Sequence, residues 1–334
     1  MSFRQTFDGI VNKSKAKLKE YTDQQSSSSH SNAPPPVPSW SKPPQAPQQP
    51  QWYHPTPPIP TETHPSYAAP QPQTQPQPYW QPNFDPSLPV SAHFIQETGA
   101  HGWGNNESQN YTTSPANSFF TPHNQLVIRA IVNTNTPNDK YTSARLNTHQ
   151  KLSRTRGFLT ATVRAPCATG IWPAFWLLPA EPFTWPNDGE VDLFESWNGD
   201  CVNHSCLHWG HFNGEDWNKH RVIETDVPSM PEREVQIGFA WMQEEDRDGA
   251  PGKMIWYLDG KVVMRGDIPA GTRRLSDWRV IINVAMGGNV CAGKLPADGS
   301  YDFVVMGLSM WDSPFGGWEH FERDWGSARE GKTM

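Results

Sequence analysis

The distribution of proline divides this chain into two parts with different capacities to fold. Of the 34 prolines, 20 lie between Pro34 and Pro89, whereas 13 of the 16 tryptophans follow residue 90. A segment of proline, glutamine and serine buries too little apolar surface to offset the entropy lost on ordering, so we expect residues 24–90 to form a disordered linker. The core must therefore come from the aromatic-rich remainder.

Charge and apolar run length exclude two classes of partner. After residue 90 the chain carries 21 Lys and Arg against 29 Asp and Glu, a balance that argues against nucleic acid. The longest apolar run, residues 171–180, contains two prolines and is about half as long as a membrane span. No signal peptide is visible in residues 1–25, so we expect a cytoplasmic protein or one exported by an unconventional route.

Residues 1–23 carry a weak amphipathic pattern of apolar positions with lysines between them. This pattern is compatible with a short helix that docks on an anionic membrane, although Ser14 interrupts the apolar stripe and favours an undocked leader. The linker that follows could present polyproline ligands to SH3 or WW modules. A plain spacer is the preferred interpretation, because PxxP matches are expected by chance in so proline-rich a segment.

Beyond residue 90 the pattern predicts short strands and no helix of convincing length. β-Branched and aromatic residues gather between polar breaks in five segments, residues 126–133, 157–165, 234–241, 253–265 and 279–286. Asp259-Gly260 within the fourth segment predicts a hairpin turn. Residues 234–241 alternate between apolar and small or polar side chains, which is typical of a half-buried antiparallel strand. We therefore expect one all-β domain, a sandwich or a barrel, acting as a monomer.

The four cysteines fit neither a paired CxxC metal site nor a dense disulfide scaffold. They are Cys167, Cys201, Cys206 and Cys291, all in the part that we expect to fold. Because no export signal is visible, buried free thiols are favoured over disulfides.

Three carboxylates within six residues distinguish the segment Gly-Glu-Val-Asp-Leu-Phe-Glu at 189–195. Acidic residues are depleted in strands, so their presence in a strand-forming segment indicates a function. Glu190 and Asp192 would share one face, and Glu195 would lie on the other in a regular strand. A bulge at Leu193-Phe194 would reset the alternation and bring all three carboxylates together.

Such a face suits chemistry on sugars. Two carboxyl groups about 5 to 5.5 Å apart serve a retaining glycosidase as nucleophile and acid/base. Tryptophans in residues 171–179 and at Trp185 flank the acidic segment, and pyranose rings stack on indoles in sugar-binding clefts. The bland alternative is a solvated polar strand with tryptophans that serve only the core.

The acidic segment resembles the signature of glycoside hydrolase family 16 in its bulged form, Glu-x-Asp-x-x-Glu, which is typical of laminarinase-like endo-β-1,3(4)-glucanases. Other segments resemble landmarks of that family in the same order, namely residues 102–107, 141–146, 170–179, 206–210 and 282–289. The resemblance implies a curved antiparallel β-sandwich of the jelly-roll, concanavalin A-like class. We assign it to residues 91–318, which leaves residues 319–334 as a C-terminal tail.

The resemblance also implies roles for individual residues. Glu190 would be the nucleophile, Glu195 the acid/base and Asp192 the helper between them. By the same resemblance the substrate-binding residues would be Asn105, Arg145, Trp172, Trp176 and His208. Each has a structural alternative: Arg145 could pair with a strand neighbour, Trp172 could lie in the core, and His208 could be a structural group.

Two departures from the family pattern affect these expectations. Members usually bind a structural calcium ion through an acidic opening strand, which is not recognisable between residues 83 and 93; only Asp302 could match a calcium ligand. We therefore expect no cofactor and no catalytic metal. Residues 243–252 replace a tight family turn with a charged insertion.

The leading hypothesis is a retaining endo-glycosidase that acts on β-glucan. A transglycosylase would use the same residues with a sugar as the acceptor. A non-catalytic glucan-binding module and a scaffold that acts through its proline-rich segment are the alternatives from other classes.

Overall fold

The computed structural model describes residues 76–211, 216 and 219–333. The predicted helix at 1–23, and residues 24–75 of the predicted linker, lie outside this range. In the described part of the chain, no helix combines the length and the apolar character needed to cross a bilayer.

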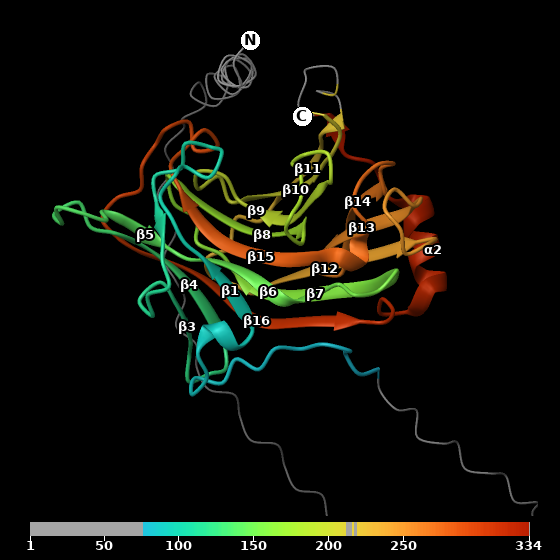
Figure 1. Ribbon diagram of the computed structural model, residues 1–334, viewed down its shortest axis with the longest axis horizontal. Helices are drawn as coiled ribbons and strands as arrows, with labels where there is room; N and C mark the ends of the chain where they lie inside the picture. Colours follow the sequence, from blue (N-terminus) through green and yellow to red (C-terminus); the bar gives the residue numbers. More distant parts are fainter. Residues whose placement is uncertain (1–75, 212–215, 217–218, 334) are drawn as a thin grey trace, which may run out of the picture. The chain divides into compact units, whose positions relative to one another are not determined.

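Two curved sheets lie face to face and form the domain, as Figure 1 shows. The first has eight strands, in the spatial order β1 (Phe94–Glu97), β6 (Arg145–Lys151), β15 (Trp278–Met286), β8 (Ile171–Pro179), β9 (Glu190–Glu195), β10 (Val202–His208), β11 (Arg221–Asp226) and β17 (Lys332–Thr333). The second has nine strands, in the order β14 (Lys261–Asp267), β13 (Gly252–Leu258), β12 (Val235–Gln243), β7 (Arg156–Arg164), β16 (Gly299–Trp311), β4 (Leu126–Val132), β5 (Tyr141–Ser143) and β2 (Asn110–Tyr111), with β3 (Ser118–Phe120) beside β4. All pairings are antiparallel except β2 with β5. The predicted all-β sandwich is confirmed.

The core lies between the sheets, and alternation along the strands fills it. Phe175 and Leu177 of β8 and Phe239 of β12 are fully buried there. The predicted hairpin is present: Asp259 and Gly260 both have positive φ and connect β13 to β14. This conformation matches the right-handed twist of the strands that the turn joins.

The packed region begins earlier than the expected boundary at residue 91. Tyr79 and Trp80 bond through their backbone to Met310 of β16, and Phe84 is 5% exposed against the core. A short 3-10 helix, η1 (Val90–Ala92), then leads into β1. The aromatic side chains explain the difference, because they supply the apolar surface that the surrounding prolines lack.

The chain also contains a helix that the strand pattern did not predict. Residues expected to form a C-terminal tail include α2 (Gly317–Ser327) and β17. Phe321 of α2 is fully buried against Phe158, Ala240 and Ile255 on the outer face of the nine-stranded sheet. The second face of β12 is therefore covered by a helix, and the strand is buried on both sides rather than on one.

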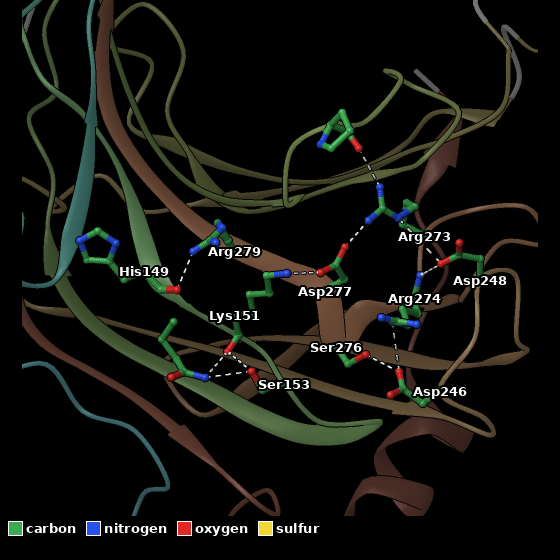
Figure 2. Close-up of polar contacts among 12 residues, drawn as sticks. His149, Lys151, Ser153, Asp246, Asp248, Arg273, Arg274, Ser276, Asp277 and Arg279 are labelled. Atoms are coloured by element: carbon green, nitrogen blue, oxygen red, sulfur yellow. Dashed lines mark hydrogen bonds and ion pairs between the residues drawn. The ribbon is translucent and has the colours of Figure 1, made fainter.

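The charged insertion docks on the loop before β15 through ion pairs, which Figure 2 shows. Oδ1 of Asp246 lies 3.5 Å from Nε of Arg274, and Oδ1 of Asp248 lies 3.8 Å from Nε of Arg273. Ser276, in the 3-10 helix η3 (Leu275–Asp277), donates a hydrogen bond to Asp246. The insertion is thus an ordered part of the domain.

Asp277 lies at the centre of this polar cluster (Figure 2). Its carboxylate pairs with Lys151 at the end of β6 and with Arg273. The backbone N–H of Arg273 donates to the carbonyl of Asp188 at 3.0 Å, shortly before β9. The cluster therefore connects three segments, one of which leads into the strand that carries the carboxylates.

The expectation of free thiols is wrong for two of the four cysteines. Cys167 and Cys201 form a disulfide across 34 residues of sequence, whereas Cys206 and Cys291 are buried free thiols. The disulfide joins the loop before β8 to the loop between β9 and β10. A hydrogen bond from the Gly170 N–H to Asn198 Oδ1, at 2.8 Å, links the same two loops.

Candidate active site

The site is built on β9, and its geometry depends on a bulge at Leu193. In the pairing of β9 with β8, Trp176 faces Asp192 and Phe175 faces Phe194, so Leu193 has no partner. Leu193 and Phe194 both enter the core although they are consecutive. The predicted bulge is therefore present, and Asp192 and Glu195 point to the opposite face of the sheet.

Glycine fixes the point at which β9 begins. Gly189 has φ +96°, a conformation that side chains disfavour. A Cβ atom at this position would lie 2.8 Å from Cη2 of Trp278, closer than contact distance. The backbone before Glu190 thus packs directly against the indole of β15.

Glu195 is 7% exposed and accepts hydrogen bonds from two indoles. Trp172 Nε1 donates to Oε1 at 2.8 Å, and Trp197 Nε1 donates to Oε2 at 3.3 Å. The backbone N–H of Glu195 donates to Asn203 Oδ1 at 3.1 Å. Trp172 is thus half-buried beside the carboxylate rather than a core residue.

Glu190 has a matching arrangement on the same strand. Trp185 Nε1 donates to its Oε2 at 2.8 Å. His208, which faces Glu190 in the pairing of β10 with β9, lies with Nε2 3.9 Å from Glu190 Oε1 and 3.2 Å from Asp192 Oδ2. The other ring nitrogen of His208 is 2.7 Å from Nδ1 of His220.

These surroundings shift the titration of both glutamates. Burial and the charge of Asp192 raise the pKa of Glu190 to about 8. Burial, Asp192 and Glu190 together raise the pKa of Glu195 well above its usual range. Of the two, Glu190 has the basic neighbour His208, which favours its ionised form. Both pKa shifts favour the protonated carboxyl group, and the neighbouring imidazole makes Glu190 the glutamate with an added reason to ionise.

The pKa values of the two histidines, His208 and His220, shift in opposite directions. Burial lowers the pKa of His208, but Asp192 and Glu190 raise it by more, so its net pKa is raised. Burial and the neighbouring His208 lower the pKa of His220 to about 4. His208 is therefore the donor in the bond between the two rings, and His220 accepts.

Arg145 has both a strand partner and an aromatic cage. Its guanidinium pairs with Glu97, which lies directly opposite on β1. The same group lies 4.9 Å from the ring centroid of Trp103 and 4.6 Å from that of Trp176. A cation between two indoles keeps its side chain in one orientation on this face.

A chain of buried polar groups holds Trp176. Its Nε1 donates to Asn283 Oδ1 at 2.8 Å, and Asn283 Nδ2 donates to the Tyr111 hydroxyl at 3.0 Å. That hydroxyl lies 3.5 Å from Glu107 Oε2. Asn105 reaches the same carboxylate, with Nδ2 3.5 Å from Oε1. Asn105 is thus linked to Trp176 only indirectly, through the side chains of Glu107, Tyr111 and Asn283.

Asp302 does not fit a calcium site. Both of its carboxylate oxygens accept hydrogen bonds from the Arg129 guanidinium, each at 2.7 Å. A guanidinium already supplies the positive charge that a calcium ion would bring. Asp302 is therefore the ion-pair partner of Arg129.

A cavity of about 440 Å³ lies elsewhere in the fold, between β10, β11 and β14. Leu207, Met264 and Arg265 are among its lining residues, and none of the three carboxylates lines it. It is not part of the carboxylate site.

Sequence reasoning missed several residues that hold the site together. Glu97, Trp197, His220 and Asn283 all contact candidate residues, but they come from four separate segments. The pairing of Glu97 follows from the register of β1 against β6, which no local pattern reveals. Trp197 carried a signal, because it lies two residues after Glu195. Asn283 carried another, because it lies within the family-like segment 282–289, although no contact was predicted for it.

Comparisons with known proteins agree on one family. Residues 94–233 match the family model described as the XgeA-like, catalytic GH16 domain. A β-glucanase of Rhodothermus marinus is 31% identical over 230 residues, which cover 63% of this chain and 75% of that protein. A glucan endo-1,3-β-glucosidase of Cryptopygus antarcticus is 31% identical over 218 residues, which cover 59% of this chain and 76% of that protein.

A solved structure is similar over most of the described domain. The laminarinase from Rhodothermus marinus is 26% identical with a TM-score of 0.58, covering 71% of this chain and 98% of that chain.

Proposed function

Because the chain belongs to glycoside hydrolase family 16, we propose that it cleaves internal β-1,3 linkages of β-glucan, with mixed β-1,3/1,4 glucans as a second substrate. The names of its relatives, a β-glucanase and a glucan endo-1,3-β-glucosidase, support this substrate class. We further propose a retaining, double-displacement mechanism, for which the site offers two differently held glutamates.

The bulge at Leu193 is the observation that supports this proposal most directly. It leaves Glu190, Asp192 and Glu195 on one face of β9, and an indole N–H holds each glutamate. A strand with no catalytic role would gain nothing from two buried acids, Asp192 and Glu195, beside a partly buried Glu190, since burying a carboxylate costs desolvation energy.

In the first step Glu190 attacks the anomeric carbon of the sugar. Glu195 gives its proton to the departing glycosidic oxygen, so the bond to the leaving chain breaks as the ester to Glu190 forms. Asp192 lies between them, 2% exposed, and its negative charge helps to keep the proton on Glu195 until transfer.

In the second step Glu195, now ionised, removes a proton from water. The hydroxide oxygen attacks the anomeric carbon, and Glu190 leaves as a carboxylate. The overall result is one glycosidic bond hydrolysed with the anomeric configuration kept.

The surrounding residues suit the binding of a glucan chain. Trp172 and Trp176 offer indole faces, Arg145 and His208 offer charged donors, and Asn105 offers an amide at greater distance. Stacking on indoles with polar groups around the ring is the usual recognition of pyranoses.

The test is hydrolysis of laminarin by wild type and Glu190→Gln, followed as release of reducing ends. The variant should lose at least about a thousandfold in kcat, because it removes the nucleophile. Glu319→Gln, an exposed glutamate on α2, is the matched control and should retain activity. Full activity of Glu190→Gln would refute the mechanism.

Product analysis separates the finer alternatives. Retention predicts β-anomers in the first NMR spectra, and an endo mode predicts a range of oligosaccharides. Products longer than the substrate would instead indicate a transglycosylase. Laminarin, lichenan, xyloglucan, agarose and chitin tested side by side would identify the glucan.

A further inference from the structure

Cys206 lies beside Asp192 and His208, and its sulfur, like their polar atoms, can bind a metal ion. The proposed reaction does not use this thiol. Cys206 lies opposite Asp192 in the pairing of β10 with β9, two residues before His208. Leu207 between them enters the core, so Cys206 and His208 share the carboxylate face. The sulfur, one His208 nitrogen and one Asp192 oxygen all lie within 4.8 Å of one another.

Asp192 leaves one oxygen available for a further ligand. Its side chain is 2% exposed, and within the described part of the chain Oδ2 has no hydrogen-bond partner. Nε2 of His208 lies 3.2 Å from it, within ion-pair distance. A buried carboxylate oxygen without a hydrogen bond is costly, and a cation would satisfy it.

His208 is oriented in the way that metal-binding histidines are. Its Nδ1 is engaged by His220 at 2.7 Å, and its Nε2 points to Asp192. Histidines that bind metals almost always use one ring nitrogen for the ion and the other for such a supporting partner. His220 therefore fixes the ring while Nε2 faces the other two ligands.

From these three observations we propose that Asp192, Cys206 and His208 form an inhibitory site for a thiol-seeking divalent cation such as Zn²⁺. Thiolate, imidazole and carboxylate together are a donor set that zinc accepts. Glu190, whose Oε1 is 3.9 Å from His208 Nε2, or a water molecule would supply the fourth ligand.

The spacing requires only a small adjustment. Bonds of about 2.0 to 2.3 Å in a tetrahedral site place ligand atoms about 3.3 to 3.8 Å apart. From the observed limit of 4.8 Å, the ligand atoms would have to approach by about 1 to 1.5 Å, which small side-chain rotations can supply. Binding breaks the S–H bond of Cys206 and the N–H bond at Nε2 of His208, forms metal–sulfur and metal–nitrogen bonds, and releases both protons to water.

Access comes from the substrate side. Cys206 is fully buried, but the side chains of Glu190 and His208 are 16% and 14% exposed. An ion that enters past them would occupy the position between nucleophile and helper. It would thereby block glycosyl transfer, a consequence that rests on the proposed function.

The experiment uses the full chain freed of metal with EDTA, in buffer without added thiol so that the disulfide stays intact. Calorimetry with Zn²⁺ should give one site, and Cys206→Ala should weaken it about tenfold or more. Cys291→Ala removes the other buried free thiol and should bind like wild type. Co²⁺ should give a sulfur-to-metal absorption band that Cys206→Ala lacks.

Inhibition is measured within each variant, as laminarin hydrolysis with and without Zn²⁺. Wild type and Cys291→Ala should be inhibited, and Cys206→Ala should resist. Cys206→Ser replaces Cys206→Ala if the latter does not fold. Absence of Zn²⁺ binding by wild type, binding unchanged in Cys206→Ala, or loss in Cys291→Ala would overturn the proposal.

Calorimetry and the Co²⁺ band do not depend on turnover, so they test the site even if no glucan is hydrolysed. Binding through Cys206 without inhibition would support the site and overturn its effect on catalysis.

Discussion

The disulfide provides a prediction whose size can be worked from the fold. Replacing both Cys167 and Cys201 by alanine opens a loop of 34 residues in the unfolded chain. The chain-entropy relation gives about 3.8 kcal/mol for a loop of this length at 25 °C. We therefore expect the double variant to lose about 3 to 4 kcal/mol of unfolding free energy.

One contact between the two loops remains in the double variant, and it accounts for the lower end of the expected loss in unfolding free energy. The hydrogen bond between Gly170 and Asn198 still links the two loops in the folded variant. The native geometry should therefore persist, and most of the loss should come from the greater freedom of the unfolded chain.

Urea denaturation of the wild type, the double variant and Cys291→Ala provides the assay. The double variant should show a lower midpoint and a slightly larger m-value, because its unfolded chain is more expanded. Cys291→Ala controls for the loss of a buried sulfur without a crosslink. A double variant no less stable than this control would refute the reasoning.

Two further substitutions test the polar contacts around the site. Burial would raise the pKa of Asp277, but Lys151 and a neighbouring arginine lower it below its usual value. Asp277→Asn should therefore cost about 1 to 2 kcal/mol of unfolding free energy at neutral pH. The difference should begin to shrink below about pH 4 and disappear only below the lowered pKa of the folded carboxylate, where the wild-type group is protonated in both states. A difference independent of pH would contradict this ion pairing. Trp185→Phe removes the N–H donor to Glu190 and should lower kcat on laminarin about tenfold. Loss of a fully buried donor would lower kcat further, but Trp185 is 43% exposed. Trp318→Phe on α2 is the control, and equal activity of both variants would refute a role for the indole donor.

Local patterns in the sequence predicted the elements that local chemistry determines. The bulge at Leu193 follows from counting residues between acids that must share a face, and the Asp259-Gly260 turn follows from backbone preference. Both depend on neighbours in sequence. The fold class followed from the same kind of periodicity.

Features that depend on distant pairing were not predictable in this way. The Cys167–Cys201 disulfide requires two loops to meet, and nothing in the spacing of the cysteines indicates that they do. Helix α2 was missed because Phe321 is its only buried residue and the apolar patch that it covers comes from three separate strands, β7, β12 and β13. The partners Glu97 and Asn283 likewise follow from sheet register and order.

The unpaired Leu193 makes β9 tolerant of one deletion and intolerant of its neighbours. Because Leu193 and Phe194 together oppose one residue of β8, loss of Leu193 would restore regular alternation, with Val191 and Phe194 toward the core and all three acids still on the other face. Loss of Val191 with the bulge intact would instead turn Glu190 toward the core and separate the two glutamates by the thickness of the sheet. Substitutions at Val191 or Leu193 need only preserve apolar volume.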